Sequence, residues 1–379
     1  MTRILLAHGF SNLHSAERMV LSFIRMLNRD EFEPILVCSK QPAEEIVHFA
    51  RKEKIRCFRA RLANYSGSWD LIRFVKFMSN ELMLFFQMLK IIRKYSISMI
   101  QVHSFSECLQ MMPVSFITKK PLLWVVQEAL PIRRFPRCVF SFLSGFVYKF
   151  LPISRYVARN IRISGIPRKK VQQVPLGISV SDSLESKAAG SEEKSIALVI
   201  QGGNRYIIES LIQAIKLIYL QFEHVKFFIS PEQAVAFQRV CEQVALTAPL
   251  PKIQLNDSFG TVNNVLDKMD LLVYVGVKIS FPVEIMEAMS SGIACVANHS
   301  GAVPEVLVDR KTGILVSPQD SRTLAKAVTE LLSDTPLREQ MGREGRKRVL
   351  QHYRPEEQLR AMKNVYRQAE SRRKQLSPF

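Results

Sequence analysis

The sequence predicts an α/β protein made of two doubly wound domains. At 379 residues the chain is too long for one hydrophobic core, because cores stop growing near about 250–300 residues. In both halves short apolar runs alternate with stretches of helical spacing, which is the order of parallel β-α units. A small, polar stretch at residues 179–194 has no apolar periodicity and indicates a linker between the halves.

The composition excludes a disordered chain, and the charged residues are unevenly distributed along the sequence. Hydrophobic residues make up 47% of the sequence, and no apolar run reaches the roughly 18 residues that a spanning helix needs. Of the net charge of +19, residues 1–183 carry +16, with 28 Lys and Arg against 12 Asp and Glu. This asymmetry indicates an anionic partner for the N-terminal half, either lipid headgroups or nucleic acid. No nucleic-acid-binding motif accompanies the charge, so we favour an anionic membrane surface.

The six cysteines are scattered and form no C-x-x-C pair. That usage fits a reduced, cytoplasmic protein, and the first six residues are too short for the apolar core of a signal peptide. No metal-ligand spacing occurs in the sequence. We therefore expect no metal, no cofactor and a cytoplasmic location, with peripheral attachment to the inner face of a membrane as a further expectation.

The N-terminal half begins with a β-α unit. RILLAHGF predicts a strand, and HSAERMVLSFIRML predicts a helix because its apolar residues keep helical spacing. PILVCSK and KIRCFRARL predict the next two strands, and residues 69–95 predict a long amphipathic helix with interleaved basic residues. SMIQV then predicts a strand that ends before His103, and PLLWVVQE a strand that ends in Gln127 and Glu128. Residues just past parallel strands face the ligand crevice, so His103 and Glu128 are candidate catalytic residues.

Residues 130–151 mix aromatic and basic side chains in a pattern too apolar for an ordinary surface loop. Arg133, Arg134, Arg137 and Phe140 belong to this stretch. Aromatic rings at headgroup level and cations on phosphates together favour membrane binding. The alternative is a buried helix whose flanking arginines are solvated. Beyond it we expect Ser154 to begin a helix and a strand to close at residues 175–178.

The second half holds the most informative stretch, residues 277–320. SIALVI and HVKFFIS predict strands that precede it. Ser280 is expected to cap a helix whose first turn carries Phe281 and Pro282 and which stops at Gly292. IACVA then predicts a buried strand, and a second short helix is expected at Pro304. Two helix N-termini near strand ends suit a phosphate, so the pattern indicates an anionic ligand.

The motifs EAMSSG, SGAVPE and TGILV, with Asp320 as the cap of a following helix, resemble the donor-site signature of family-4 retaining glycosyltransferases. The resemblance covers nearly the whole chain. It implies two Rossmann-like domains that face a central cleft (the GT-B fold), at residues 1–178 and 195–354 with the linker 179–194 between them. A last helix at 355–379 would cross back to the first domain.

The resemblance also implies an activity: transfer of a hexose from a nucleotide-diphosphate sugar to a lipid-linked or polysaccharide acceptor, with retention of configuration. Glu287 would hold the ribose hydroxyls of the nucleotide, and His103 would lie near the donor sugar. Glu128 would act as a base or position an acceptor hydroxyl. The other expected donor contacts are Ser280, Phe281, Val283, Gly202, Arg205 and Gly301. Ser15, which replaces a glycine usual in the family, is grouped with the basic first-domain residues on the acceptor side.

At three donor positions the chain departs from the family pattern. Ile279 stands where the family has its first glutamate, and Gln201 and Tyr206 stand where an arginine and a lysine bind the diphosphate. These losses favour a competing hypothesis, a non-catalytic scaffold or binding protein of a polysaccharide or glycolipid pathway. Glu287 also shares one helix face with Ser280 and Glu284, so the alternative to a ligand role is an ordinary solvated face.

Overall fold

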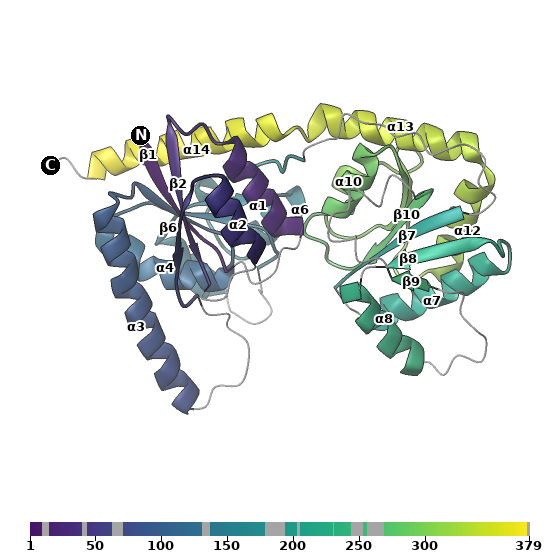
Figure 1. Ribbon diagram of the computed structural model, residues 1–379, viewed down its shortest axis with the longest axis horizontal. Coiled ribbons are helices and arrows are strands. Elements are labelled where there is room, and N and C mark those ends of the chain that lie inside the picture. Colours follow the sequence, from purple (N-terminus) through teal and green to yellow (C-terminus); the bar gives the residue numbers. More distant parts are fainter. Residues whose placement is uncertain are drawn as a thin grey trace. The chain divides into compact units, whose positions relative to one another are not determined.

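The computed structural model describes residues 1–9, 15–39, 44–62, 71–130, 137–178, 194–202, 205–229, 231–243, 253–255 and 269–376. The chain divides into two compact units. The first comprises Met1–Leu176 with Pro355–Phe379, and the second comprises Gly177–Arg354. Each unit contains one six-stranded sheet, and all strand pairs in both sheets are parallel (Figure 1).

The sheet of the first unit has the strand order β3-β2-β1-β4-β5-β6. Its strands are β1 (Thr2–Ala7), β2 (Phe32–Cys38), β3 (Arg56–Arg59), β4 (Met99–Val102), β5 (Leu122–Val126) and β6 (Val147–Pro152). Its helices are α1 (Ser15–Met26), α2 (Glu44–Lys52), α3 (Leu71–Lys94), α4 (Phe105–Thr118), α5 (Arg137–Ser144), α6 (Arg155–Ile163), the short 3-10 helix η1 (Arg168–Lys170) and α14 (Pro355–Leu376). The apolar runs form buried strands because helices cover the sheet.

The C-terminal helix α14 is part of the first unit. Tyr366 is fully buried there, and its hydroxyl donates to Gln101 Oε1 at 2.6 Å. The Tyr366 ring also packs against Phe32 and Phe23. The helix is therefore joined to the middle of the sheet by a side-chain hydrogen bond as well as by apolar contacts.

The sheet of the second unit has the strand order β12-β11-β10-β7-β8-β9. Its strands are β7 (Lys194–Gln201), β8 (Val225–Ile229), β9 (Ile253–Leu255), β10 (Leu271–Gly276), β11 (Ala294–Asn298) and β12 (Ile314–Val316). Its helices are α7 (Arg205–Tyr219), α8 (Pro231–Gln243), α10 (Val283–Ser290), α11 (Val303–Val306), α12 (Ser321–Ser333) and α13 (Thr335–His352). Two doubly wound, Rossmann-like sheets were the predicted fold class, and the structure has this fold.

Local capping follows the sequence in two places and departs from it in a third. Ser154 Oγ accepts the N–H of Val157, and Asp320 Oδ1 accepts that of Thr323, so both predicted caps are present. Ser280 does not cap a helix. The helix begins at Val283, with Pro282 at the cap position, because a residue that precedes a proline is disfavoured in the helical region.

The expected strand at residues 175–178 is also absent. Gln172 N–H donates to Phe150 O and Val174 N–H to Pro152 O, which ties this segment to β6 at two points. Pro175 then has no N–H to continue a ladder. The segment leads, without regular structure, to residues 179–193, so the predicted linker lies outside the described residues except for Lys194, which begins β7.

Candidate functional site

Each sheet reverses its strand order at one place, and these two places locate the candidate sites. In the first unit the reversal lies between β1 and β4, and in the second it lies between β7 and β10. Ligands of open α/β sheets bind beyond the carboxyl ends of the strands at such a switch point. The residues that follow these four strands are therefore the first candidates.

In the first unit, His8 follows β1 and His103 follows β4. Their rings stack with centroids 4.9 Å apart and planes 15° from parallel. His8 Nδ1 lies 3.3 Å from Glu107 Oε1, in the first turn of α4. The same carboxylate accepts three backbone N–H groups, from Gly9 at 2.7 Å, His103 at 2.9 Å and Ser104 at 3.0 Å. Glu107 thus joins the ends of both central strands.

Burial and charge set the protonation of this cluster. Burial, and then the charge of His8, lower the pKa of His103 to about 3. Burial alone raises the pKa of Glu107, but the charge of His8 and hydrogen bonds from His8 and the His103 backbone lower that pKa to about 2. At neutral pH the cluster therefore holds an uncharged His103 beside an ionised carboxylate.

The His103 side chain is buried, with only 6% of its surface exposed. Gln101 Nε2 donates to His103 Nε2 at 3.1 Å, which leaves the proton on Nδ1, and Nδ1 has no hydrogen-bond partner among the described residues. His103, Gln101 and Gln127 help to line a cavity of about 20 Å³, enough for one water molecule. The expected catalytic partner Glu128 is exposed, two residues beyond β5.

In the second unit, the loop after β10 is fixed against the loop after β11. Gly276 N–H donates to Asn298 Oδ1 at 3.0 Å, and Lys278 N–H donates to Ser300 Oγ at 2.9 Å. Gly301 has a φ of +57°, and a Cβ on it would lie 2.1 Å from Ile279 O. Only glycine permits this approach, so Gly301, which was expected as a donor contact, shapes the loop after β10.

The helix α10 presents two carboxylates near this loop. Glu287, the expected ribose ligand, is half-buried on α10. Glu284 accepts a hydrogen bond from Gln201 Nε2 at 3.4 Å, and burial followed by the Glu284 charge raises the pKa of Tyr274 well above its usual value. Gln201, expected at the position of a diphosphate-binding arginine, thus donates to a carboxylate.

The remaining donor-side residues lie either near the loop after β10 and the start of α10 or at the start of α7. Gly202 follows β7 with a φ of +84°, and a Cβ there would lie 3.8 Å from Val277 O, so it is next to the loop after β10. Phe281 packs edge to face on Tyr353, and Val283 is buried. Arg205 begins α7 and forms an ion pair with Glu209 at 2.6 Å, and Tyr206 is 66% exposed. Ile279 is 6% exposed, so it is a packing residue.

The acceptor-side and membrane residues are only partly described. Arg133 and Arg134 lie outside the described residues, as does the side chain of Ser15. Arg137 is exposed at the start of α5. Phe140 was expected at an interface, and that is wrong: it is fully buried and packs against Phe105. Within the described residues no helix is long and apolar enough to cross a membrane.

Comparison with known proteins agrees with the architecture. The two Rossmann-like units match GT-B glycosyltransferase structures in fold. The family described as Glycosyl transferases group 1 matches residues 182–348, most of the second unit.

Particular relatives can be named. A glycosyltransferase from Rickettsia africae has a TM-score of 0.77 at 17% identity, over 97% of this chain and 98% of that one. Anabaena HepE, in complex with UDP and glucose, has a TM-score of 0.75 at 13% identity, over 96% and 99%. The N-acetyl-alpha-D-glucosaminyl L-malate synthase of Bacillus anthracis is 30% identical over 105 residues. That match spans only 28% of the length of either chain.

Sequence reasoning missed several site residues. His8 follows β1 and Asn298 ends β11. His103 was predicted from the same kind of position, so both residues could have been predicted from the sequence pattern. Glu107 was hidden because its partner Gly9 is 98 residues away. Lys278 is exposed in the loop after β10, and none of the ion pairs among the described residues includes it.

Proposed function

We propose that the protein is a glycosyltransferase that takes a sugar from a nucleotide-diphosphate donor. The observation that carries this proposal is a coincidence of two features. The match to Glycosyl transferases group 1 falls on the second unit, and that unit contains a switch-point loop fixed by Asn298, Ser300 and Gly301 with Glu287 on the next helix. The similar fold of Anabaena HepE was solved with UDP and glucose, which supports a donor of this class.

The donor diphosphate would be held mainly by uncharged groups. Gln201 and Tyr206 carry no charge, and Arg205 is paired with Glu209. Lys278 is the cation that remains in the loop after β10, and backbone N–H groups at the start of α10 add partial positive charge. These groups would stabilise the leaving diphosphate as negative charge develops on it.

Glu287 would bind the ribose hydroxyls in this proposal, because a half-buried carboxylate is a strong acceptor for two neighbouring O–H groups. In the first unit, His103 is uncharged at neutral pH and retains an Nδ1–H for a hydroxyl oxygen. It would position a sugar and would not act as an acid. Glu128 is exposed and free to approach an acceptor hydroxyl as a base.

The finer features of the reaction belong to the same proposal. We infer a hexose donor, retention of configuration, and a lipid-linked or polysaccharide acceptor bound by the basic first unit. The name of the Bacillus anthracis relative includes L-malate, so a small hydroxy acid is the alternative acceptor class in this proposal. The excess of positive charge in residues 1–183 favours an anionic acceptor in either case.

A second candidate function is a scaffold that does not catalyse transfer. The observation that favours it is Ile279, which is buried and cannot accept a hydrogen bond from a donor sugar at the position of the first glutamate. A scaffold would use the same fold to bind a glycan or nucleotide without turnover.

The proposal is tested by incubating the full chain with a panel of UDP- and GDP-sugars and candidate acceptors, and measuring release of the nucleoside diphosphate. The proposed function requires release that depends on one donor and is increased by an acceptor. Glu339→Gln, an exposed change on α13, is the matched control and should leave the rate unchanged. A donor that is bound but never turned over, with every acceptor, would establish the scaffold instead.

A further inference from the structure

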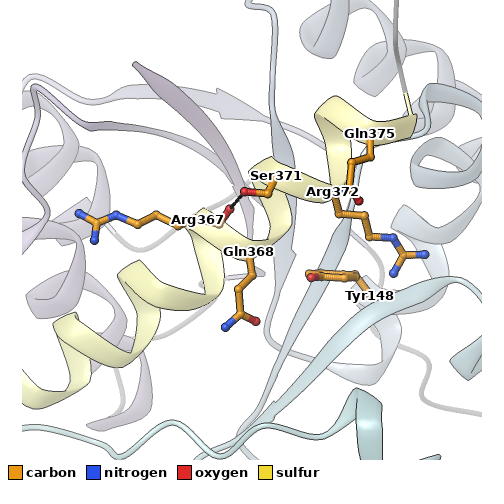
Figure 2. A pocket seen from close by; sticks show the side chains of 6 residues that line it. All are labelled: Tyr148, Arg367, Gln368, Ser371, Arg372 and Gln375. Atoms are coloured by element: carbon orange, nitrogen blue, oxygen red, sulfur yellow. Dashed lines mark hydrogen bonds between the residues drawn. The ribbon is translucent and has the colours of Figure 1, made fainter.

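A basic concavity lies in the first unit, beside the C-terminal end of α14. Its volume is about 560 Å³, and it is lined by Tyr148, Arg367, Gln368, Ser371, Arg372 and Gln375 (Figure 2). The Arg372 guanidinium carbon lies 4.8 Å from the centroid of the Tyr148 ring. Tyr148 is near the start of β6, where the pairing with β5 shifts register. The concavity is therefore at the amino edge of the sheet, away from the carboxyl edge that carries His8 and His103.

Of the two arginines that line this concavity, Arg367 is paired with a carboxylate and Arg372 is in no ion pair among the described residues. Arg367 pairs with Glu31, and Arg373 pairs with Glu370. Figure 2 shows the Arg367 guanidinium turned away from Tyr148, whereas Arg372 lies over the ring. Among the described residues, no salt bridge includes Arg372.

Two lysines of η1 add to this charge. Burial, and then the charges of Arg372 and Lys169, lower the pKa of Lys170. The Lys170 ammonium donates to the carbonyl oxygens of Ser144 and Val147, so it is fixed at the turn between α5 and β6. Lys149 Nζ donates to Lys169 O at 2.8 Å, which holds a further cation beside η1. Cations crowded together in this way attract an anion.

Exposed aromatic side chains adjoin the same turn. Phe146 contacts Phe116 and Phe142 edge to face, with ring centroids 5.7 Å and 5.3 Å apart. Phe116 is 69% exposed and Phe142 is 68% exposed. We call these three residues the aromatic cluster. It connects the end of α4, the helix α5 and the start of β6, and the carbonyl groups bound by Lys170 lie in the same α5–β6 turn.

We propose that the basic concavity and the aromatic cluster together form a docking surface for an anionic phospholipid bilayer. A headgroup phosphate would lie in the concavity against Arg372, with Lys169 and Lys170 near it, and the aromatic rings would insert at headgroup level. Charge complementarity selects this occupant, because cations on phosphates and rings at the interface are the two contributions that hold peripheral proteins on membranes. The inference does not depend on the glycosyltransferase activity.

Co-sedimentation with lipid vesicles tests the proposal. The full chain should bind vesicles that contain phosphatidylglycerol and not vesicles of phosphatidylcholine alone, with binding that weakens as salt rises. Arg372→Gln should weaken binding about fivefold, the effect of one cation near an anionic surface. Arg360→Gln is the matched control, since it removes the same charge from an exposed, ion-paired position on the same helix, and it should bind like the unaltered chain.

Two measurements distinguish a bilayer from a soluble phosphate as the occupant. One is vesicle binding by Phe142→Ser, and the other is calorimetric titration with inorganic pyrophosphate. Phe142 is exposed, so the change should leave the fold intact and weaken only vesicle binding. Calorimetric binding of pyrophosphate that is lost in Arg372→Gln, with no binding to anionic vesicles, would overturn the bilayer as occupant. Equal losses in Arg372→Gln and Arg360→Gln would overturn the docking surface, because net charge alone would then explain binding.

Discussion

Glu107 Oε1 accepts the backbone N–H of Gly9 at 2.7 Å, which joins the first turn of α4 to the end of β1. The other carboxylate oxygen accepts the N–H groups of His103 and Ser104. One buried side chain therefore fixes both strand ends at the switch point of the first unit. Loss of this carboxylate should disturb the site and the stability of the fold together.

Glu107→Gln replaces an ionised acceptor by an amide with one acceptor oxygen, so at least one buried N–H loses its partner. We expect the free energy of unfolding to fall by about 2–4 kcal/mol, measured by urea denaturation. Glu44→Gln on the exposed start of α2 is the control and should change little. A Glu107→Gln variant as stable as the control would show that the three hydrogen bonds do not hold the strand ends.

Acid should destabilise the protein through His103. Its pKa is about 3 in the folded chain against 6.5 in the unfolded chain, so the unfolded chain binds more protons in between. This contribution to stability is complete above pH 6.5 and is lost as the pH falls toward 3. Folding lowers the pKa of Glu107 from 4.5 to about 2, so the contribution of this carboxylate to stability is also lost as the pH falls through that range. Thermal melting of the unaltered chain and of His103→Gln over this range checks the prediction, and the variant should show a shallower decline. Parallel declines would contradict it.

Gly301→Ala tests the fixed loop of the second unit. The added Cβ would meet Ile279 O at 2.1 Å on a backbone with φ of +57°, so the loop after β10 must move. We expect a loss of stability of about 2 kcal/mol or more and weaker nucleotide binding, measured by melting and calorimetry. Unchanged binding would show that the loop after β10 does not contribute to the donor site.

Ile279→Glu should not restore a donor contact. The side chain is buried, and its Cδ1 would lie 3.2 Å from a Cβ at Gly276, so the new carboxylate would enter an apolar contact. We expect a loss of roughly 2–4 kcal/mol in unfolding free energy, whereas Ile279→Val should cost about 1 kcal/mol. A stable Ile279→Glu variant with faster transfer would show that the side chain turns out toward a donor sugar.

The sequence was sufficient for the alternation of strands and helices, and for the caps at Ser154 and Asp320, because these depend on neighbours within a few residues. It was not sufficient where packing between segments that are distant in the sequence decides the structure. Phe140 lies in an apolar-basic stretch whose pattern is the same for a membrane face and for a core, and only packing against Phe105 separates them. The cap at Ser280 failed because Pro282 restricts the residue before it.

His103 was predicted from its place after a strand, and Gly202 from the family resemblance. Each follows a strand at the switch point of its own sheet. Glu107 was not predictable, since contacts across 98 residues leave no periodic signal. The role of Gly301 in shaping the loop became clear only from its positive φ and its approach to Ile279.

Calorimetric titration with UDP and GDP tests the central claim, a nucleotide-diphosphate site in the second unit that depends on Glu287. We predict binding of one nucleoside diphosphate at about 0.1–1 mM, weak because Gln201 and Tyr206 carry no charge. Glu287→Ala should abolish this binding without lowering the melting temperature, whereas Glu339→Gln should bind like the unaltered chain. If the unaltered chain bound neither nucleotide at roughly millimolar concentration, or Glu287→Ala bound as tightly, the likeness to glycosyltransferases would be one of fold alone.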